Sequence, residues 1–231
     1  MTRTFSSEKE FRDWNESMFI KYDNEHCVNH PNPLLRFVEH RRIRTLLRFC
    51  AIKDGDKVLE VGCGSGYVLN LINRGELYGI DISKTAIEWA KRKLSAKPNV
   101  KHLSAQPAER MKFANDTFDV VFCSEVIEHV PNPRKLAEEI CRVVKPGGRV
   151  VFTFPNEGTI NFAKQTVKWL GLYRLMLKGI PEHMEDEWHL SEFSLPLFKR
   201  TVAGVFHIRR VRAIPFFFLP LRYAALLRPN K

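Results

Sequence analysis

Short apolar runs alternate with stretches of helical periodicity between residues 57 and 155. The apolar runs are KVLEV, LYGID, NVKHL, FDVVFC and RVVFTF, and the helical stretches include YVLNLINR, SKTAIEWAKRKL and RKLAEEICRVV. Strands that are apolar on both faces and connected through helices pair in parallel, with right-handed crossovers and with helices on both faces of the sheet. The pattern therefore predicts an α/β fold with a doubly wound, mostly parallel sheet.

The flanking segments predict helices before this core and strands after it. Residues 1–56 are expected to form a helical cap that includes the amphipathic stretch RFVEHRRIRTLLRFC, and residues 156–188 a helical insertion or lid. In residues 189–231, HIRRVRAI and PFFFLPL are expected to close the edge of the sheet. A length of 231 residues without internal repeats fits one domain over residues 1–231, with its core at 57–155.

The chain is strongly basic, with a formal net charge of +11, which favours anionic partners such as phosphates, nucleic acid or acidic lipids. Its basic runs HRRIRTLLR (40–48) and HIRRVR (207–212) are expected to be solvated faces of amphipathic elements. No run approaches the roughly 20 apolar residues of a membrane span. The start MTRTFSSEKEF lacks the apolar core of a signal peptide, and the five cysteines lack metal-binding spacing. These features predict a cytoplasmic protein with reduced thiols.

A glycine-rich turn follows the first predicted strand, in VLEVGCGSGYVL. Gly62, Gly64 and Gly66 allow a sharp turn from strand to helix and a close approach of a ligand to the backbone. The spacing G-x-G-x-G differs from the G-x-G-x-x-G of dinucleotide sites. Glu60 precedes the turn, and a carboxylate there would repel a pyrophosphate but attract a cationic ligand.

The second predicted strand, LYGID, ends in Asp81. A carboxylate at this position can accept two hydrogen bonds from a ribose diol. Its alternative role is that of a helix N-cap, which Ser83 can fill as well. The glycine-rich turn, Asp81 and the later FDVVFCSEV together resemble the class I S-adenosylmethionine-dependent methyltransferases over about residues 55–155.

This resemblance implies a seven-stranded Rossmann-like sheet and S-adenosyl-L-methionine as the cofactor. Glu60 and the glycine-rich turn would hold the methionine end of the cofactor, and Asp81 with Ile82 would hold the ribose and adenine. The implied cofactor-binding set is Glu60, Gly62, Cys63, Gly64, Gly66, Asp81, Ile82, Gln106 and Ser124.

One position departs from the family pattern. Pro107 stands where the family often carries an acidic residue that bonds the adenine amino group. Gln106, Glu109 or backbone groups are expected to substitute for it.

The stretch SEVIEHVPNP follows the fourth predicted strand and brings Glu125, Glu128 and His129 together. On a helix these positions are i, i+3 and i+4 and share one face. They predict either a solvated turn or a site for Mg²⁺ or Mn²⁺, with Zn²⁺ and Fe²⁺ as alternatives, since a divalent cation lowers the pKa of a bound hydroxyl. A further ligand is expected from PEHMEDEWHLSEF, which supplies His183 and His189.

The pattern E-x-x-E-H with a distant histidine resembles two methyltransferase groups. One is the quinone-biosynthesis O-methyltransferases, and the other is the small-RNA 3′-terminal 2′-O-methyltransferases. The resemblance implies metal binding by Glu125, Glu128, His129 and His189, with His129 and Glu128 as the catalytic residues. The alternative is that Glu125 and His129 contact cofactor and acceptor directly, with His129 as a general base and Glu128 merely exposed.

Two further segments bear on the acceptor. The insertion at 156–188 combines apolar residues with Lys164, Lys168, Arg174 and Lys178, so it predicts either a lid packed on the core or an amphipathic helix at a membrane surface. Within residues 214–227, PFFFLPL predicts either a last core strand or an interfacial anchor flanked by arginines. A small-molecule or lipid-linked hydroxyl acceptor is therefore expected. RNA is the alternative, although the chain lacks a recognisable RNA-binding module.

Overall fold

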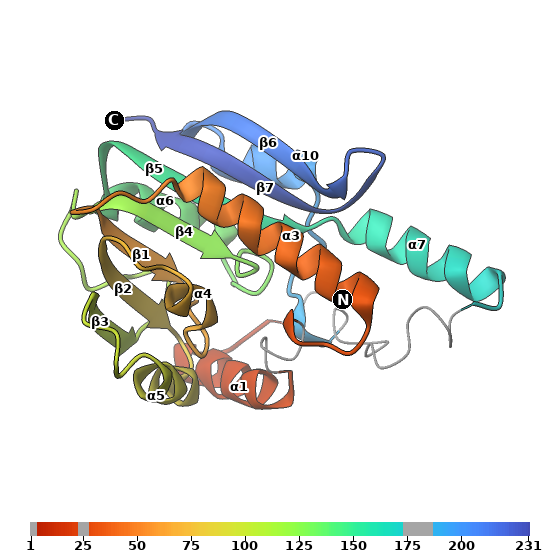
Figure 1. Cartoon of the computed structure of the whole chain (residues 1–231), viewed down its shortest axis with the longest axis horizontal. Helices are drawn as coiled ribbons and strands as arrows, with labels where there is room; N and C mark the ends of the chain where they lie inside the picture. Colours follow the sequence, from red (N-terminus) through yellow and green to blue (C-terminus); the bar gives the residue numbers. More distant parts are fainter. Residues whose placement is uncertain (1–3, 23–27, 173–186) are drawn as a thin grey trace.

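The computed structural model describes residues 4–22, 28–172 and 187–231, and its centre is a seven-stranded sheet in the order β3-β2-β1-β4-β5-β7-β6 (Figure 1). The pairs β1–β2, β2–β3, β1–β4 and β4–β5 are parallel, whereas β7 pairs antiparallel with both β5 and β6. This arrangement confirms the predicted doubly wound, mostly parallel sheet. The strands are β1 (Lys57–Val61), β2 (Glu76–Asp81), β3 (Val100–Ala105), β4 (Phe118–Ser124), β5 (Val144–Pro155), β6 (Phe206–Phe216) and β7 (Leu219–Pro229).

Helices cover both faces of the sheet, and most of them begin at a polar N-cap. Asn32 and Asn132 each accept a backbone N–H bond and precede a proline at the first helical position, which fixes where α3 and α6 begin. The helices are α1 (Glu8–Lys21), α3 (Pro33–Cys50), α4 (Tyr67–Asn70), α5 (Lys84–Lys93), α6 (Pro133–Val143), α7 (Glu157–Trp169) and α10 (Leu195–Val202).

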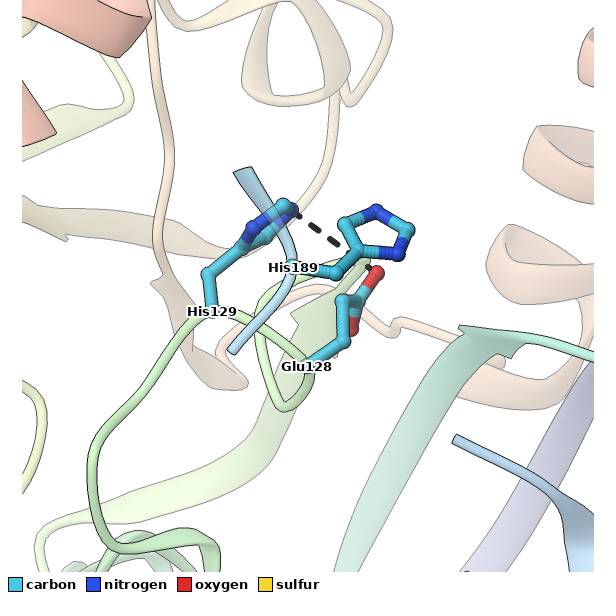
Figure 2. Close-up of side chains that lie close together, drawn as sticks. All are labelled: Glu128, His129 and His189. Carbon is cyan, nitrogen blue, oxygen red and sulfur yellow. Dashed lines mark ion pairs between the residues drawn. The ribbon is translucent and has the colours of Figure 1, made fainter. Parts of the chain in front are cut away.

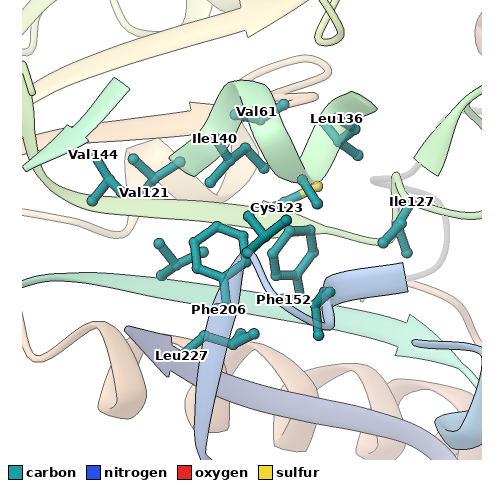
Figure 3. Close-up of a cluster of buried hydrophobic side chains, with 14 of the residues drawn as sticks. Val61, Val121, Cys123, Ile127, Leu136, Ile140, Val144, Phe152, Phe206 and Leu227 are labelled. Atoms are coloured by element: carbon teal, nitrogen blue, oxygen red, sulfur yellow. The ribbon is translucent and has the colours of Figure 1, made fainter. Parts of the chain in front are cut away.

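Alternate residues of the central strand β4 enter two separate apolar cores. Phe122 packs with α3, α4 and α5 on one face, whereas Val121 and Cys123 pack with α6 and α10 on the other. Figure 3 shows the second of these cores, in which Ile140 of α6 lies with Cys123 and Phe152 of the sheet. A strand that is buried on both faces reads as a continuous apolar run, which is why FDVVFC was recognisable in the sequence.

Three local expectations were wrong. YVLNLINR forms only the single turn α4 and not a longer helix. PFFFLPL is not a strand, because β6 ends at Phe216, Phe217 and Phe218 form the turn, and β7 begins at Leu219. Residues 125–130 form a turn, not a helix, so Glu125, Glu128 and His129 do not share a helical face.

The insertion begins as the predicted helix, α7, while Arg174, Lys178 and His183 lie outside the described residues. Among the helices in the described ranges, none combines the length and apolar character needed to cross a membrane.

Replacing Phe122 by alanine is expected to lower the free energy of unfolding by about 3–5 kcal/mol, because the fully buried ring would leave a cavity between the sheet and α3. Urea denaturation followed by circular dichroism measures the loss. The matched control is Leu71→Ala, at an exposed apolar residue, which should change the same quantity by no more than about 0.5 kcal/mol. Equal losses in the two variants would contradict the assignment of the core.

Candidate active site

The glycine-rich turn lies directly after β1 and is tied to the end of β2. The N–H groups of Gly62 and Cys63 donate to the carbonyl of Ile80, at 2.8 and 2.9 Å. Gly62 has φ +71°, and a Cβ built there would lie 2.3 Å from Cγ2 of Val126. Only glycine therefore fits at position 62 without moving the chain that follows β4.

Asp81 holds this turn through its carboxylate. Its Oδ2 accepts a bond from the N–H of Gly64 and its Oδ1 one from the N–H of Ser83, both at 2.9 Å. Ser83 itself caps α5 by accepting from the N–H of Ala86. The capping alternative thus belongs to Ser83, and Asp81 keeps the remaining lone pairs of its oxygens for a ligand.

A pocket opens beside Asp81 and is covered by α1. Asp81, Ile82 and Gln106 line it from the sheet side, and Phe11, Asn15 and Phe19 line it from α1. Gln106 is held in place, since its Nε2 donates to Ser104 and its Oε1 accepts from the N–H of Lys112. The α1 residues were missed in the sequence because their helix carried no motif.

Polar contacts along its length hold α1 over this pocket. Glu16 accepts from the N–H groups of Lys84 and Thr85, at the start of α5, at 3.0 Å each. At the C-terminal end of α1, Lys21 pairs with Glu187, and the hydroxyl of Tyr22 donates to the same carboxylate at 2.6 Å. At its N-terminal end, the exposed Glu8 pairs with Arg110 at 2.9 Å.

A second pocket continues past the glycine-rich turn. It shares Gly62, Gly64, Glu125, His129 and Trp188 with the first pocket, so the two form one crevice at the carboxyl ends of the strands. Of the predicted site residues, this pocket brings together Glu60, Gly62, Cys63, Gly64, Ser124, Glu125, Glu128, His129 and His189.

Three carboxylates in this crevice keep an oxygen that is buried without a hydrogen-bond partner in the described part of the chain, namely Oε2 of Glu60, Oε1 of Glu125 and Oε2 of Glu128. Burial raises the pKa of Glu60, and burial together with the charge of Glu125 raises that of Glu128. An unpaired buried carboxylate is costly, and a cation placed beside it would remove that cost. The crevice is therefore suited to cationic ligands.

Glu128, His129 and His189 form a group of candidate metal ligands, with one ligand atom from each residue lying within 4.8 Å of the others (Figure 2). Glu128 is buried, and its Oε1 lies 3.9 Å from Nε2 of His129. The sequence predicted these three residues as ligands, although it placed two of them on a helix.

Both histidines are oriented by an oxygen that contacts Nδ1 of the ring. Nδ1 of His129 lies 3.0 Å from the carbonyl oxygen of Trp188, and Nδ1 of His189 lies 2.7 Å from the carboxylate of Glu157. A carbonyl or a carboxylate accepts the proton of Nδ1, which leaves the lone pair on Nε2, and metal-binding histidines are oriented in this way. Burial and the nearby His189 lower the pKa of His129 to about 3, so the ring is neutral, as a ligand must be.

Glu125 stands apart from this group. It follows β4 with φ 54°, and its Oε2 lies 3.0 Å from Nη1 of Arg222. The predicted set of four ligands is thus reduced to three that the structure brings together.

A buried ion-pair network borders the second pocket, and sequence reasoning missed it. Glu39 accepts from Nε of Arg42 and from Nε of Arg222, both at 2.9 Å, and Arg42 also donates to Ser124. Burial would raise the pKa of Glu39, but the two guanidinium groups outweigh burial and lower it to about 2. Arg42 is buried, so the expectation that HRRIRTLLR is only a solvated face was wrong for this residue.

Glu39→Gln is expected to make the free energy of unfolding depend less on pH on the acid side. The carboxylate of Glu39 has a lower pKa in the folded protein than its usual 4.5, so its contribution is complete above about 4.5 and is lost as the pH falls toward about 2. The contribution is on the order of 3 kcal/mol. Urea midpoints measured across this pH window test it, with Glu138→Gln, at an exposed carboxylate on α6, as the control. An unchanged acid slope in Glu39→Gln would contradict the network.

Comparison with known proteins agrees with the fold. The family described as "Methyltransferase domain" matches residues 59–152. The ubiquinone biosynthesis O-methyltransferase of Aliivibrio fischeri (strain MJ11) is 30% identical over 132 residues, which are 56% of this chain and 56% of that protein. The enzyme of the same name from Alkalilimnicola ehrlichii is 33% identical over 129 residues, or 54% of this chain and 52% of that protein. The chain spans about half the length of the curated relatives it matches.

Among solved structures, the geranyl diphosphate C-methyltransferase from Streptomyces coelicolor A3(2), in complex with Mg²⁺, geranyl diphosphate and S-adenosyl-L-homocysteine, superposes with a TM-score of 0.68. The two sequences are 12% identical, and the match covers 98% of this chain and 100% of that one. At this identity the likeness establishes the shared fold.

Proposed function

We propose that the chain, whose residues 59–152 match the family described as "Methyltransferase domain", transfers the methyl group of S-adenosyl-L-methionine to a hydroxyl of a small-molecule or lipid-linked acceptor. The observation that carries this proposal is that Glu128, His129 and His189 meet in the same pocket as Glu60 and the glycine-rich turn. A group that binds a cation beside the methyl donor serves an acceptor whose proton is hard to remove.

The cofactor is assigned to the crevice residues by charge and position. Glu60, with its unpaired oxygen, would pair with the ammonium of the methionine end, while Asp81 would accept from the ribose hydroxyls. Ile82 and Gln106 line the part of the pocket proposed for adenine. The remaining proposed contacts are Gly62, Cys63, Gly64, Gly66 and Ser124.

Glu128, His129 and His189 would hold a divalent cation. The orphaned buried oxygen of Glu128 and the two oriented imidazoles fit such an ion. Bound there, the ion would lower the pKa of the acceptor hydroxyl and fix its position. Of Mg²⁺ and Mn²⁺, the two imidazoles favour Mn²⁺, because Mg²⁺ prefers oxygen ligands and water. Glu157 and the carbonyl of Trp188 keep the proton of each ring on Nδ1 throughout.

Methyl transfer forms an O–C bond at the acceptor and breaks an S–C bond of the cofactor, whose sulfur keeps the electron pair. The hydroxyl proton would pass to solvent water once its pKa is lowered. Without an ion, Nε2 of His129 would have to accept this proton. Its pKa of about 3 makes it a weak base at neutral pH, and this supports the metal over the alternative.

RNA methylation at a ribose 2′-hydroxyl is the second candidate, favoured by the exposed arginines of α3. Its affinity should fall steeply with salt. The peripheral membrane contact expected of residues 156–188 and 214–227 also stays a prediction, to which α7 contributes the exposed side chains of Phe162 and Trp169.

Titration of Mn²⁺ and Mg²⁺ into protein saturated with S-adenosyl-L-homocysteine tests the proposal calorimetrically. We expect saturable Mn²⁺ binding that is lost in the double variant His129→Ala, His189→Ala and kept in His207→Ala, which alters an exposed histidine of β6. Absence of binding in the parent would remove the metal from the proposal and open the acceptor search to nitrogen, carbon and carboxylate nucleophiles.

A further inference from the structure

The β6–β7 hairpin, whose course Figure 1 shows, carries a cluster of exposed phenylalanine rings at its tip. Phe217 and Phe218, which form the turn, are 87% and 69% exposed. The rings of Phe216 and Phe218 stack at 5.2 Å, and Phe37 of α3 lies 6.1 Å from Phe216. We call Phe37, Phe216, Phe217 and Phe218 the aromatic tip. Exposed rings at a hairpin apex add nothing to the core, so they point to an interaction.

A basic face adjoins the aromatic tip. The guanidinium of Arg41 lies over the rings of Phe37 and Phe216, at 6.0 and 5.6 Å. The only acidic residue of α3 is the buried Glu39, and the sequences of β6 and β7 contain none. The exposed arginines of the two elements that adjoin the tip are Arg36, Arg44 and Arg48 on α3 and Arg209 and Arg210 on β6. Positive charge is therefore not neutralised by acidic residues of the same elements.

We propose that the aromatic tip and the basic face dock the protein on an anionic lipid bilayer, with the tip entering the boundary between headgroups and acyl chains. A bilayer surface has an apolar acyl-chain boundary beneath a layer of anionic headgroups. The exposed rings can bury their apolar surface in the acyl-chain boundary, while the guanidinium groups bind the lipid phosphates of the headgroup layer.

RNA fits this surface less well. Residues 213–221 read AIPFFFLPL, nine residues without one polar side chain. RNA-binding surfaces place hydrogen-bonding groups among their stacking rings to contact base edges and 2′-hydroxyls. A tip without side-chain donors or acceptors can enter a bilayer but cannot make those contacts.

Docking in this way would bring the second pocket near the bilayer. α3 carries Phe37 and Arg41 of the docking surface as well as Glu39 and Arg42 of the pocket, and Arg222 follows the tip along β7. This consequence rests on the proposed function, whereas the docking itself does not. The inference thus adds a location for the acceptor, at the membrane surface.

Co-sedimentation of the full chain with vesicles tests the docking. Vesicles of phosphatidylcholine mixed with phosphatidylglycerol should bind the parent, and vesicles of phosphatidylcholine alone should bind it far more weakly. Phe217→Ser should lower the affinity roughly tenfold, as the loss of one inserted ring predicts, whereas Leu71→Ser, at an exposed apolar residue outside the surface, should not.

Charge reversal provides a second test of the docking in the same vesicle assay. Arg44→Glu with Arg48→Glu should lower the affinity more than tenfold, since each arginine near an anionic surface contributes about 1 kcal/mol. The matched control is Lys91→Glu with Arg92→Glu on α5, which has the same net charge and alters a different exposed surface. Because methyl transfer is not measured here, failure of these assays leaves the proposed function untouched.

Four results would overturn the proposal. The first is equal binding to both kinds of vesicle, and the second is equal loss of affinity in the surface and control variants. The third is a parent that binds single-stranded RNA but not anionic vesicles, in which case RNA is the occupant. The fourth is a parent that does not bind anionic vesicles but forms a dimer which Phe217→Ser dissociates, in which case a second copy of the chain is the occupant.

Discussion

Replacing Glu128 by glutamine is expected to lower methyl transfer by about 100-fold or more while leaving the affinity for S-adenosyl-L-homocysteine within a factor of about two of the parent. The amide keeps the size of the side chain but removes the carboxylate that, within the described residues, groups with both oriented histidines. Transfer to a catechol acceptor measures the first quantity, and calorimetry with S-adenosyl-L-homocysteine measures the second.

The outcome separates two roles of Glu128. Glu138→Gln, on the exposed side of α6, controls for the loss of a carboxylate and should transfer methyl groups like the parent. Full activity of Glu128→Gln in the presence of a chelator would rule out the proposed cation, because both the ion and its buried ligand would then be dispensable.

Asp81→Ala should weaken the binding of S-adenosyl-L-homocysteine by about 100-fold or more, since hydrogen bonds to a charged group are worth about 1.5–3 kcal/mol each. The variant loses the proposed bonds to the ribose and also the bonds that hold Gly64 and Ser83. Calorimetric titration measures the affinity, and circular dichroism checks that the sheet remains folded.

Asp54→Ala, at an exposed carboxylate before β1, provides the matched control and should bind the ligand like the parent. If Asp81→Ala also bound like the parent, the assignment of the whole first pocket would be wrong. Within the described residues, Asp81 is the carboxylate that links the turn after β1 to the residues after β2.

The fold could be predicted most reliably from short segments whose consecutive residues have the same structural role. FDVVFC is buried on both faces of the sheet, and the glycine-rich turn needs a positive φ at Gly62, so both features leave a local pattern. The turn at residues 125–130 was misread because the spacing of its polar residues fits a helix as well. The spacing of polar residues alone cannot distinguish a turn of helix from a non-helical turn.

The ion-pair network could not be found in this way. Glu39 and Arg222 are 183 residues apart, and Arg42 looks like any arginine of an amphipathic helix until the fold buries it. The orientation of the histidines is also a tertiary feature, since Glu157 lies 32 residues before the ring of His189 that it orients. Partners that are distant in sequence leave no local signal, whereas the residue types after β4 and in PEHMEDEWHLSEF led to the prediction of Glu128, His129 and His189, which the structure brings together.

The anchoring of α1 has a consequence for the order of events in turnover. Because α1 covers the pocket proposed for the cofactor, we expect exchange of spent cofactor to involve a movement of α1 away from α5, from residues 187–188, or from both. Residue 187 is two positions from His189, so opening at that anchor disturbs the candidate cation site as well. We therefore expect the methylated product to leave before S-adenosyl-L-homocysteine, with release of the latter setting the pace of the cycle.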